Sequence, residues 1–131
     1  MNPLCVEEGI GIVPWSPLAR GFLAGNRHRG DKGGDTVRAK SDGFAHSLYY
    51  REDDYAVVDR LSEIAGKRGV GNAQVALAWL LAQPGITAPI VGASKMQHLD
   101  DAVAALDIRL DAAELKALAE PYKPHPVLGH Q

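Results

Sequence analysis

The sequence predicts an α/β fold built on two parallel strands, and the pattern of apolar residues is the main reason. Residues 10–13 and residues 87–91 are largely apolar runs without alternating polar side chains, as in strands buried on both faces of a parallel sheet. Helical periodicity fills much of the chain between and after these runs, so strands and helices alternate. We therefore expect one α/β unit over residues 1–131, in which two strands are accompanied by their helices.

Composition and charge limit the classes of protein to which the chain can belong. Its 131 residues are 46% hydrophobic, enough for one domain with a core, and a formal net charge of −2 provides no basic surface for nucleic acid. No apolar run approaches the roughly 20 residues of a membrane span, and the start lacks the apolar region of a signal peptide. The single Cys5 excludes an internal disulfide and fits a reducing compartment. We expect a cytoplasmic protein that binds neither nucleic acid nor membranes.

The first elements are the end of a helix and a strand. Residues 3–8 resemble the last turns of a helix, and Gly9 is typical of the residue that ends one. A domain seldom begins with the end of a helix, so we expect further chain before it. The strand over residues 10–13 should end at Pro14, which has no N–H to donate to a sheet.

A long polar segment, residues 26–53, follows the first strand and contains four glycines. Such long loops are uncommon in compact domains and are usually lids, binding loops or disordered; a lid and a disordered loop both remain open. Asp31 and Asp35 dilute its basic side chains, which favours a solvated loop over a dedicated anion clamp. The basic side chains that give the segment a basic bias include Arg27, His28, Arg29, Lys32, Arg38 and Lys40.

Two helices are expected between this segment and the second strand. Asp53 and Asp54 favour the start of the first helix, where acidic groups complement the helix dipole, and Gly69 ends it. Asn72 is the expected N-cap of the second helix, which Pro84 stops. The first helix has one apolar stripe, and the second is apolar on nearly every face, which predicts burial of both. The stripe consists of Tyr55, Val58, Leu61, Ile64 and Ala65, and the apolar run of the second helix is residues 75–81.

Two more helices are expected after the second strand. Leu99, Val103 and Leu106 form the stripe of an amphipathic helix, which predicts one buried face. Asp111 and Glu114 have the spacing of a capping box, which predicts the start of the last helix. Two strands cannot close a barrel or form a wide sheet, so the predicted fold is incomplete.

The strand ends are the candidate binding region, because ligands of α/β proteins lie at the carboxyl ends of parallel strands. Trp15 offers a flat ring face and Ser16 a hydrogen bond directly after the first strand. After the second strand, residues 92–95 combine a hydroxyl, an ammonium and the start of a helix, the elements of a phosphate site. Two interpretations stay open from these residues alone: a shared anion-binding rim, or ordinary turns with Trp15 in the core and Lys95 solvated.

The residues that carry chemistry in enzymes are scarce. The five histidines have no metal-ligand spacing, and the chain has no nucleophile elbow, Walker loop or GxGxxG. None of the four tyrosines stands at a strand end beside an acidic residue or a lysine. We therefore assign no catalytic residue, and the sequence predicts a binding rim without a general acid.

Three blocks in order, residues 9–21 (GIGIVPWSPLARG), 73–81 (AQVALAWLL) and 88–95 (APIVGASK), resemble the C-terminal part of an aldo-keto reductase. The resemblance extends from Leu4 to Gln131. It implies a partial TIM (β/α)8 barrel with its two C-terminal parallel strands and a lid loop over residues 26–53. It also implies binding of NADP(H) in extended form and reduction of aldehydes or ketones by hydride transfer.

The resemblance also implies which residues bind the cofactor. Trp15 matches the aromatic residue that stacks on the nicotinamide, and the residues that match the pyrophosphate loop are Ser16, Leu18, Arg20 and Gly21. Those that match the turn at the adenosine 2′-phosphate are Gly92, Ser94 and Lys95. His98 and Ala102 stand where many members of the family have a glutamine and an asparagine near the adenine.

The family's catalytic Asp, Tyr, Lys and His belong to earlier strands, which the chain lacks. We therefore expect a C-terminal fragment of an NADP(H)-dependent reductase, with a carbonyl substrate only in the context of a complete barrel. The alternative is a non-catalytic nucleotide-binding or protein-docking module. An opened barrel has unpaired strand edges, so association through them is expected in either case.

Overall fold

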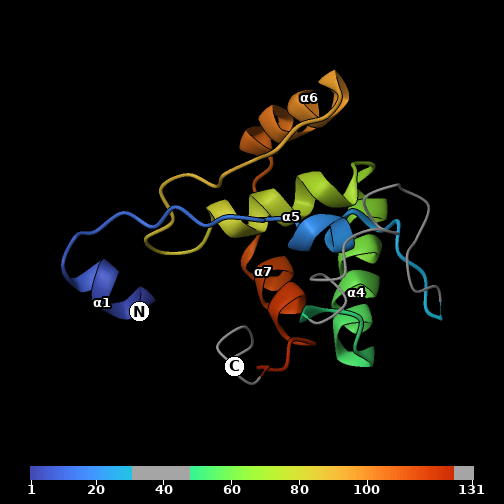
Figure 1. Ribbon diagram of the computed structural model, residues 1–131, viewed down its shortest axis with the longest axis horizontal. Coiled ribbons are helices and arrows are strands. Elements are labelled where there is room, and N and C mark those ends of the chain that lie inside the picture. Colours follow the sequence, from blue (N-terminus) through green and yellow to red (C-terminus); the bar gives the residue numbers. More distant parts are fainter. Residues whose placement is uncertain (31–47, 126–131) are drawn as a thin grey trace.

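The computed structural model describes residues 1–30 and 48–125. The helix α5 occupies the middle of the molecule, with α6 on one side and the α4–α7 pair on the other (Figure 1). The 3₁₀ helix η1 packs against α4 and α5. The helices are α1 (Asn2–Glu7), η1 (Ala19–Ala24), α4 (Glu52–Arg68), α5 (Asn72–Leu81), α6 (Met96–Ala104), η2 (Ala105–Asp107) and α7 (Ala112–Ala119).

The main core lies where α4, α5 and α7 meet. All five residues of the apolar stripe on α4 are buried, and so are Val75, Ala76, Leu77 and Ala78 of α5, which confirms both predicted helices. Leu118 of α7 joins this core. The helical period is a local property of the sequence, and it places these side chains on a common face wherever they find a partner helix.

Two helix ends agree with the sequence, and one helix start differs. Gly9 and Gly69 end α1 and α4 with φ of 66° each, in the left-handed region. Asn72 is not the N-cap of α5: Gly71 holds that position and donates its N–H to the Gln74 side chain (3.0 Å). The Asn72 amide instead donates to Ser62 Oγ (2.7 Å) and links α5 to α4.

The capping box that begins α7 forms as predicted. The N–H of Glu114 donates to Asp111 Oδ1 (2.8 Å), and the N–H of Asp111 donates to Glu114 Oε2 (2.9 Å). Two N–H groups that would otherwise lack an acceptor are satisfied in this way, which defines the start of the helix.

The two predicted strands do not form within the described residues, although their segments do meet in parallel. One bridge joins Ile12 to Ile86, with hydrogen bonds from Ile12 N–H to Gly85 O and from Thr87 N–H to Ile12 O, both 2.9 Å. The next rung of a parallel ladder needs N–H groups on residues 14 and 89. Both are prolines, so the ladder stops after a single bridge.

The bridge also depends on a glycine. A Cβ on Gly11 would meet Thr87 Oγ1 too closely, so any larger residue there requires Thr87 or the paired backbone to shift. Ile10, Val13 and Ile90 are 54–57% exposed, which contradicts the predicted burial on both faces. Among residues 1–30 and 48–125, no further strand pairs with these segments, so their side chains stay in solvent.

The helix α6 forms as predicted but exposes the stripe that was expected to be buried. Leu99, Val103 and Leu106 are 47–56% exposed. The helix contacts α5 through its other face, where Gln74 Nε2 donates to Asp101 Oδ1 (3.0 Å) and Ala105, in η2, is buried. Within the part of the chain that the structure describes, no helix is long and apolar enough to span a membrane.

Candidate functional site

The turn after the first segment has an unusual backbone. Ser16, Ala19 and Arg20 all have φ between 48° and 56°, a region that residues with a Cβ seldom adopt. Backbone hydrogen bonds of 2.9 Å stabilise it, from Ala19 to Ser16 and from Gly21 to Leu18. Such conformations persist only where the surrounding structure holds the backbone in place, and they are concentrated at ligand sites.

Arg27 stabilises this turn through a hydrogen bond from its side chain to the backbone of the turn. Its side chain is buried, and it donates from Nη2 to Arg20 O (3.4 Å), from Nε to the Tyr50 hydroxyl (3.1 Å) and from Nη1 to Asn26 Oδ1 (2.7 Å). Gly21, with φ of 93°, lies so close that a Cβ there would be 3.3 Å from Arg27 Nη2. The prediction of a solvated basic loop is therefore wrong for Arg27, since the guanidinium finds its acceptors inside the protein. No local pattern distinguishes Arg27 from the exposed basic residues beside it.

The described ends of the predicted lid are tied to α4. Arg29 pairs with Glu52 (2.8 Å) and Asp59 (2.6 Å), and hydrogen bonds to these carboxylates raise the pKa of Arg29 above its ordinary value. The Tyr55 hydroxyl donates to His28 O (3.1 Å). The Arg29 guanidinium is therefore paired with carboxylates of this chain rather than with an anion from outside. The greater part of the predicted lid, residues 31–47, lies outside the described residues.

The second candidate segment leads into α6. Residues 91–100 are all exposed, and Lys95 is the N-cap residue of the helix. Ser94 Oγ lies 3.4 Å from His98 Nδ1, one turn along. The first amides of a helix have no intrahelical acceptor, so this helix start presents N–H groups beside a hydroxyl and an ammonium. The arrangement can accept an anion such as a phosphate.

The two candidate segments are joined at their bases. The N–H of Ile90 donates to Pro14 O (2.9 Å), so Trp15 and Val91 leave the paired region at the same end. Beyond this point the chains separate, one leading to η1 beside α4 and the other to α6 on the far side of α5 (Figure 1). Trp15 is 63% exposed, which excludes the interpretation that its ring packs in a core of this chain. The structure thus places Ser94 beside His98 and Arg27 beside Arg20. A single binding rim shared by the two segments remains a prediction.

Comparison with known proteins decides the family. The sequence profile described as Aldo/keto reductase family matches residues 1–123. The chain belongs to the aldo-keto reductase family. The family implies a TIM barrel and generally uses NAD(P)H.

Curated relatives agree with this assignment. The chain is 39% identical to versiconal hemiacetal acetate reductase of Aspergillus parasiticus over 130 residues, covering 97% of this chain and 36% of that protein. It is also 39% identical to an aldo-keto reductase of Metarhizium robertsii over 133 residues, covering 99% of this chain and 34% of that protein. The chain therefore spans about a third of the length of the curated relatives it matches.

The candidate residues fit the nicotinamide cofactor that aldo-keto reductases generally use. The Trp15 ring is exposed and can stack on another ring. The hydroxyl of Ser94 and the ammonium of Lys95 stand at the start of α6, where a phosphate is favoured by charge and by hydrogen bonding. Apart from Gly92 and its chain neighbours, no described atom lies within 4 Å of a Cβ built on Gly92, so a ligand could approach the backbone there.

Proposed function

We propose that the chain supplies the C-terminal, cofactor-binding part of an NADP(H)-dependent aldo-keto reductase that reduces aldehydes or ketones. The observation that carries the proposal is the exposed combination of Ser94, Lys95 and the first turn of α6. A cation and a hydroxyl at a helix start suit a phosphate monoester, and the 2′-phosphate is the group that separates NADPH from NADH.

Each candidate residue has a proposed role toward the cofactor. Trp15 would stack on the nicotinamide ring, and the η1 turn would follow the pyrophosphate, with Arg20 as its charged group. NADPH would supply the hydride when bound. The remaining proposed contacts are Ser16, Leu18 and Gly21 along the pyrophosphate, Gly92, Ser94 and Lys95 around the adenosine 2′-phosphate, and His98 near the adenine.

We assign no catalytic residue to this chain. The general acid and a carbonyl substrate would belong to a complete barrel, of which this chain would form two βα units, so the chain by itself is expected to bind cofactor without turning it over. A cytoplasmic location is proposed with this function.

A second candidate function is a non-catalytic nucleotide-binding or docking module. The observation in its favour is the set of exposed apolar side chains, which includes Leu99 and Val103 on α6 and Ile10 and Val13 beside the bridge. Contiguous exposed apolar surface and unpaired backbone edges both promote association. Association would not require catalysis.

Binding of NADPH to the purified chain tests the main proposal. The fluorescence of its two tryptophans should be quenched saturably, and NADH should bind at least about tenfold more weakly, because a charged hydrogen bond contributes roughly 1.5–3 kcal/mol. Equal affinity for the two cofactors would overturn the 2′-phosphate assignment. Absence of any binding would overturn the proposal that the nucleotide contacts are held by this part of the chain.

A further inference from the structure

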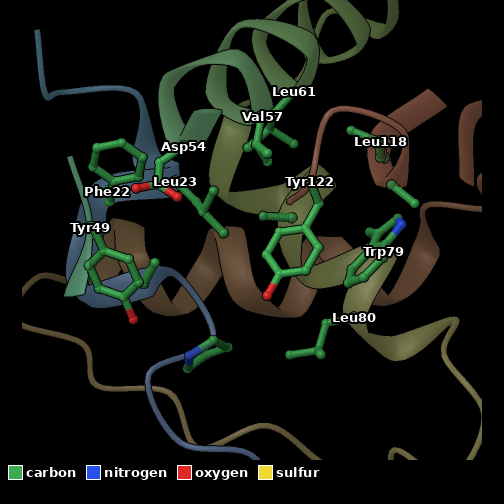
Figure 2. A pocket seen from close by; sticks show the side chains of 14 residues that line it. Phe22, Leu23, Tyr49, Asp54, Val57, Leu61, Trp79, Leu80, Leu118 and Tyr122 are labelled. Carbon is green, nitrogen blue, oxygen red and sulfur yellow. The ribbon is translucent and has the colours of Figure 1, made fainter. Parts of the chain in front are cut away.

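A pocket of about 430 Å³ lies between η1, α4, α5 and α7, and Pro17 of the turn before η1 also lines it. Figure 2 shows Phe22 and Tyr49 on one side of it, Trp79 on the other and the Tyr122 ring between them. None of the nine residues proposed to contact NADP(H) lines the pocket. Its volume falls in the range of small-molecule sites.

The walls of the pocket are apolar and strongly aromatic. Aliphatic side chains, among them Leu23, Val57, Leu80 and Leu118, line the pocket together with the rings. Aromatic walls favour flat ligands, which can stack against a ring face or contact its edge. Burial of such a ligand would remove apolar surface from water on both sides of the contact.

Asp54, the one charged group among the described residues of the wall, is already paired. Asp54 accepts a hydrogen bond from His125 Nε2 at Oδ1 (2.8 Å) and from the backbone N–H of Arg51 at Oδ2 (2.9 Å). The indole N–H of Trp79 is likewise used, since it donates to Leu115 O (3.3 Å). A charged ligand would find no free counter-charge among these groups, and its desolvation would be costly.

We propose that this pocket binds an uncharged molecule with one or two fused aromatic rings. The pocket shares no residue with the proposed nucleotide contacts, but it lies beside them. Ala19, Phe22 and Leu23 line it from η1, the same helix that contains Arg20 and Gly21. The proposal does not depend on the proposed function, because a chain that failed to bind NADPH would still contain the pocket.

The test uses the neutral fluorophore 6-propionyl-2-(dimethylamino)naphthalene with the purified 131-residue chain. Its emission should shift to the blue saturably with a stoichiometry of one, and excess ligand at one hundred times Kd should raise the melting temperature by roughly 10 °C. Amide resonances that move in a ¹H–¹⁵N spectrum should belong to η1, α4, α5 and α7. The same titration with NADPH present separates this site from the nucleotide site.

Two variants on one helix provide a matched pair. Ala119 and Ala113 are both exposed residues of α7, but only Ala119 lines the pocket. Ala119→Phe should fill part of the pocket and weaken binding at least tenfold, whereas Ala113→Phe should leave binding unchanged. Equal binding by both variants, or unsaturable binding with resonance shifts centred on Leu99 and Val103 of α6, would overturn the proposal. If Ala119→Phe does not fold, the resonance map of the unaltered chain decides.

Discussion

The backbone N–H of Ile90 donates to the carbonyl oxygen of Pro14 (2.9 Å), which in a regular parallel ladder would accept from residue 89. Residue 89 is a proline and cannot donate, so the partner shifts by one residue. Residue 14, also a proline, cannot donate to residue 87. This one relationship explains why two apolar segments lie parallel without forming a strand pair.

Pro89→Ala should extend this pairing by one rung. The new amide of residue 89 should exchange with solvent at least about tenfold more slowly than an unprotected amide, because it can donate to Pro14 O. The free energy of unfolding should change by less than about 1 kcal/mol, since one net hydrogen bond is offset by the lost rigidity of proline. Pro84→Ala, outside the pairing, is the control; rapid exchange at residue 89 would contradict the ladder explanation.

Gly11→Ala should destabilise the chain by about 1–3 kcal/mol, measured by urea unfolding, because the added Cβ would meet Thr87 Oγ1. The double variant with Thr87→Ala removes that oxygen and should recover most of the loss. Gly66→Ala is the contrasting case: Gly66 lies within α4, and apart from its chain neighbours and the nearby helix backbone no described atom is within 4 Å of its added Cβ. The substitution should therefore stabilise the chain by roughly 0.5–1 kcal/mol. A Gly11→Ala chain as stable as the parent would contradict the close approach.

Arg27→Met should cost about 2–4 kcal/mol of unfolding free energy, because it removes the hydrogen bonds that the buried Arg27 guanidinium donates to the Arg20 carbonyl and the Tyr50 hydroxyl. It should also weaken NADPH binding by loosening the η1 turn. The exposed Arg29→Met is the control and should change stability little, since surface ion pairs contribute little. Equal effects of the two variants would show that burial of Arg27 is unimportant.

Glu114→Gln should remove a pH-dependent part of the stability. The Arg68 guanidinium donates to Glu114 (2.7 Å) and holds the pKa of Glu114 below its usual range, so the stabilisation is present above about pH 5 and is lost as the pH falls through the folded-state pKa. Glutamine keeps one acceptor oxygen for the cap, so the substitution removes the charge and the hydrogen bond that Arg68 donates to the other oxygen. Urea titrations should show a loss below about 1 kcal/mol at pH 7 that disappears near pH 3; a constant difference down to that pH would exclude the charge as its cause.

Lys95→Glu should weaken NADPH binding by about ten- to a hundredfold and change NADH affinity by less than about twofold, because only NADPH carries the 2′-phosphate. Lys116→Glu, at an exposed position on α7 with the same change of charge, should affect neither cofactor. The measurement is fluorescence titration of each variant with both cofactors. An equal loss for NADPH and NADH would place Lys95 away from the 2′-phosphate.

The helices of this chain follow from its sequence. The stripe on α4, the apolar α5, the Asp111–Glu114 capping box and the glycines after α1 and α4 all depend on contacts within a few residues. Even here one cap was assigned wrongly, because Gln74 satisfies the Gly71 N–H and leaves Asn72 for the contact with Ser62. The three motif blocks also identified the family, which the comparison confirmed.

Only the tertiary structure decided what depends on residues far apart in the chain. An apolar run predicts a strand, but a strand needs a partner that can donate, and Pro89 opposite Pro14 removes the rung. The α6 stripe predicts burial, but only a neighbouring element could cover it, and α5 contacts the other face. Burial of Arg27 and the pocket between η1, α4, α5 and α7 likewise arise from packing. Sequence determined the local elements because their hydrogen bonds are local; packing determined burial, pairing and the pocket because those contacts are not.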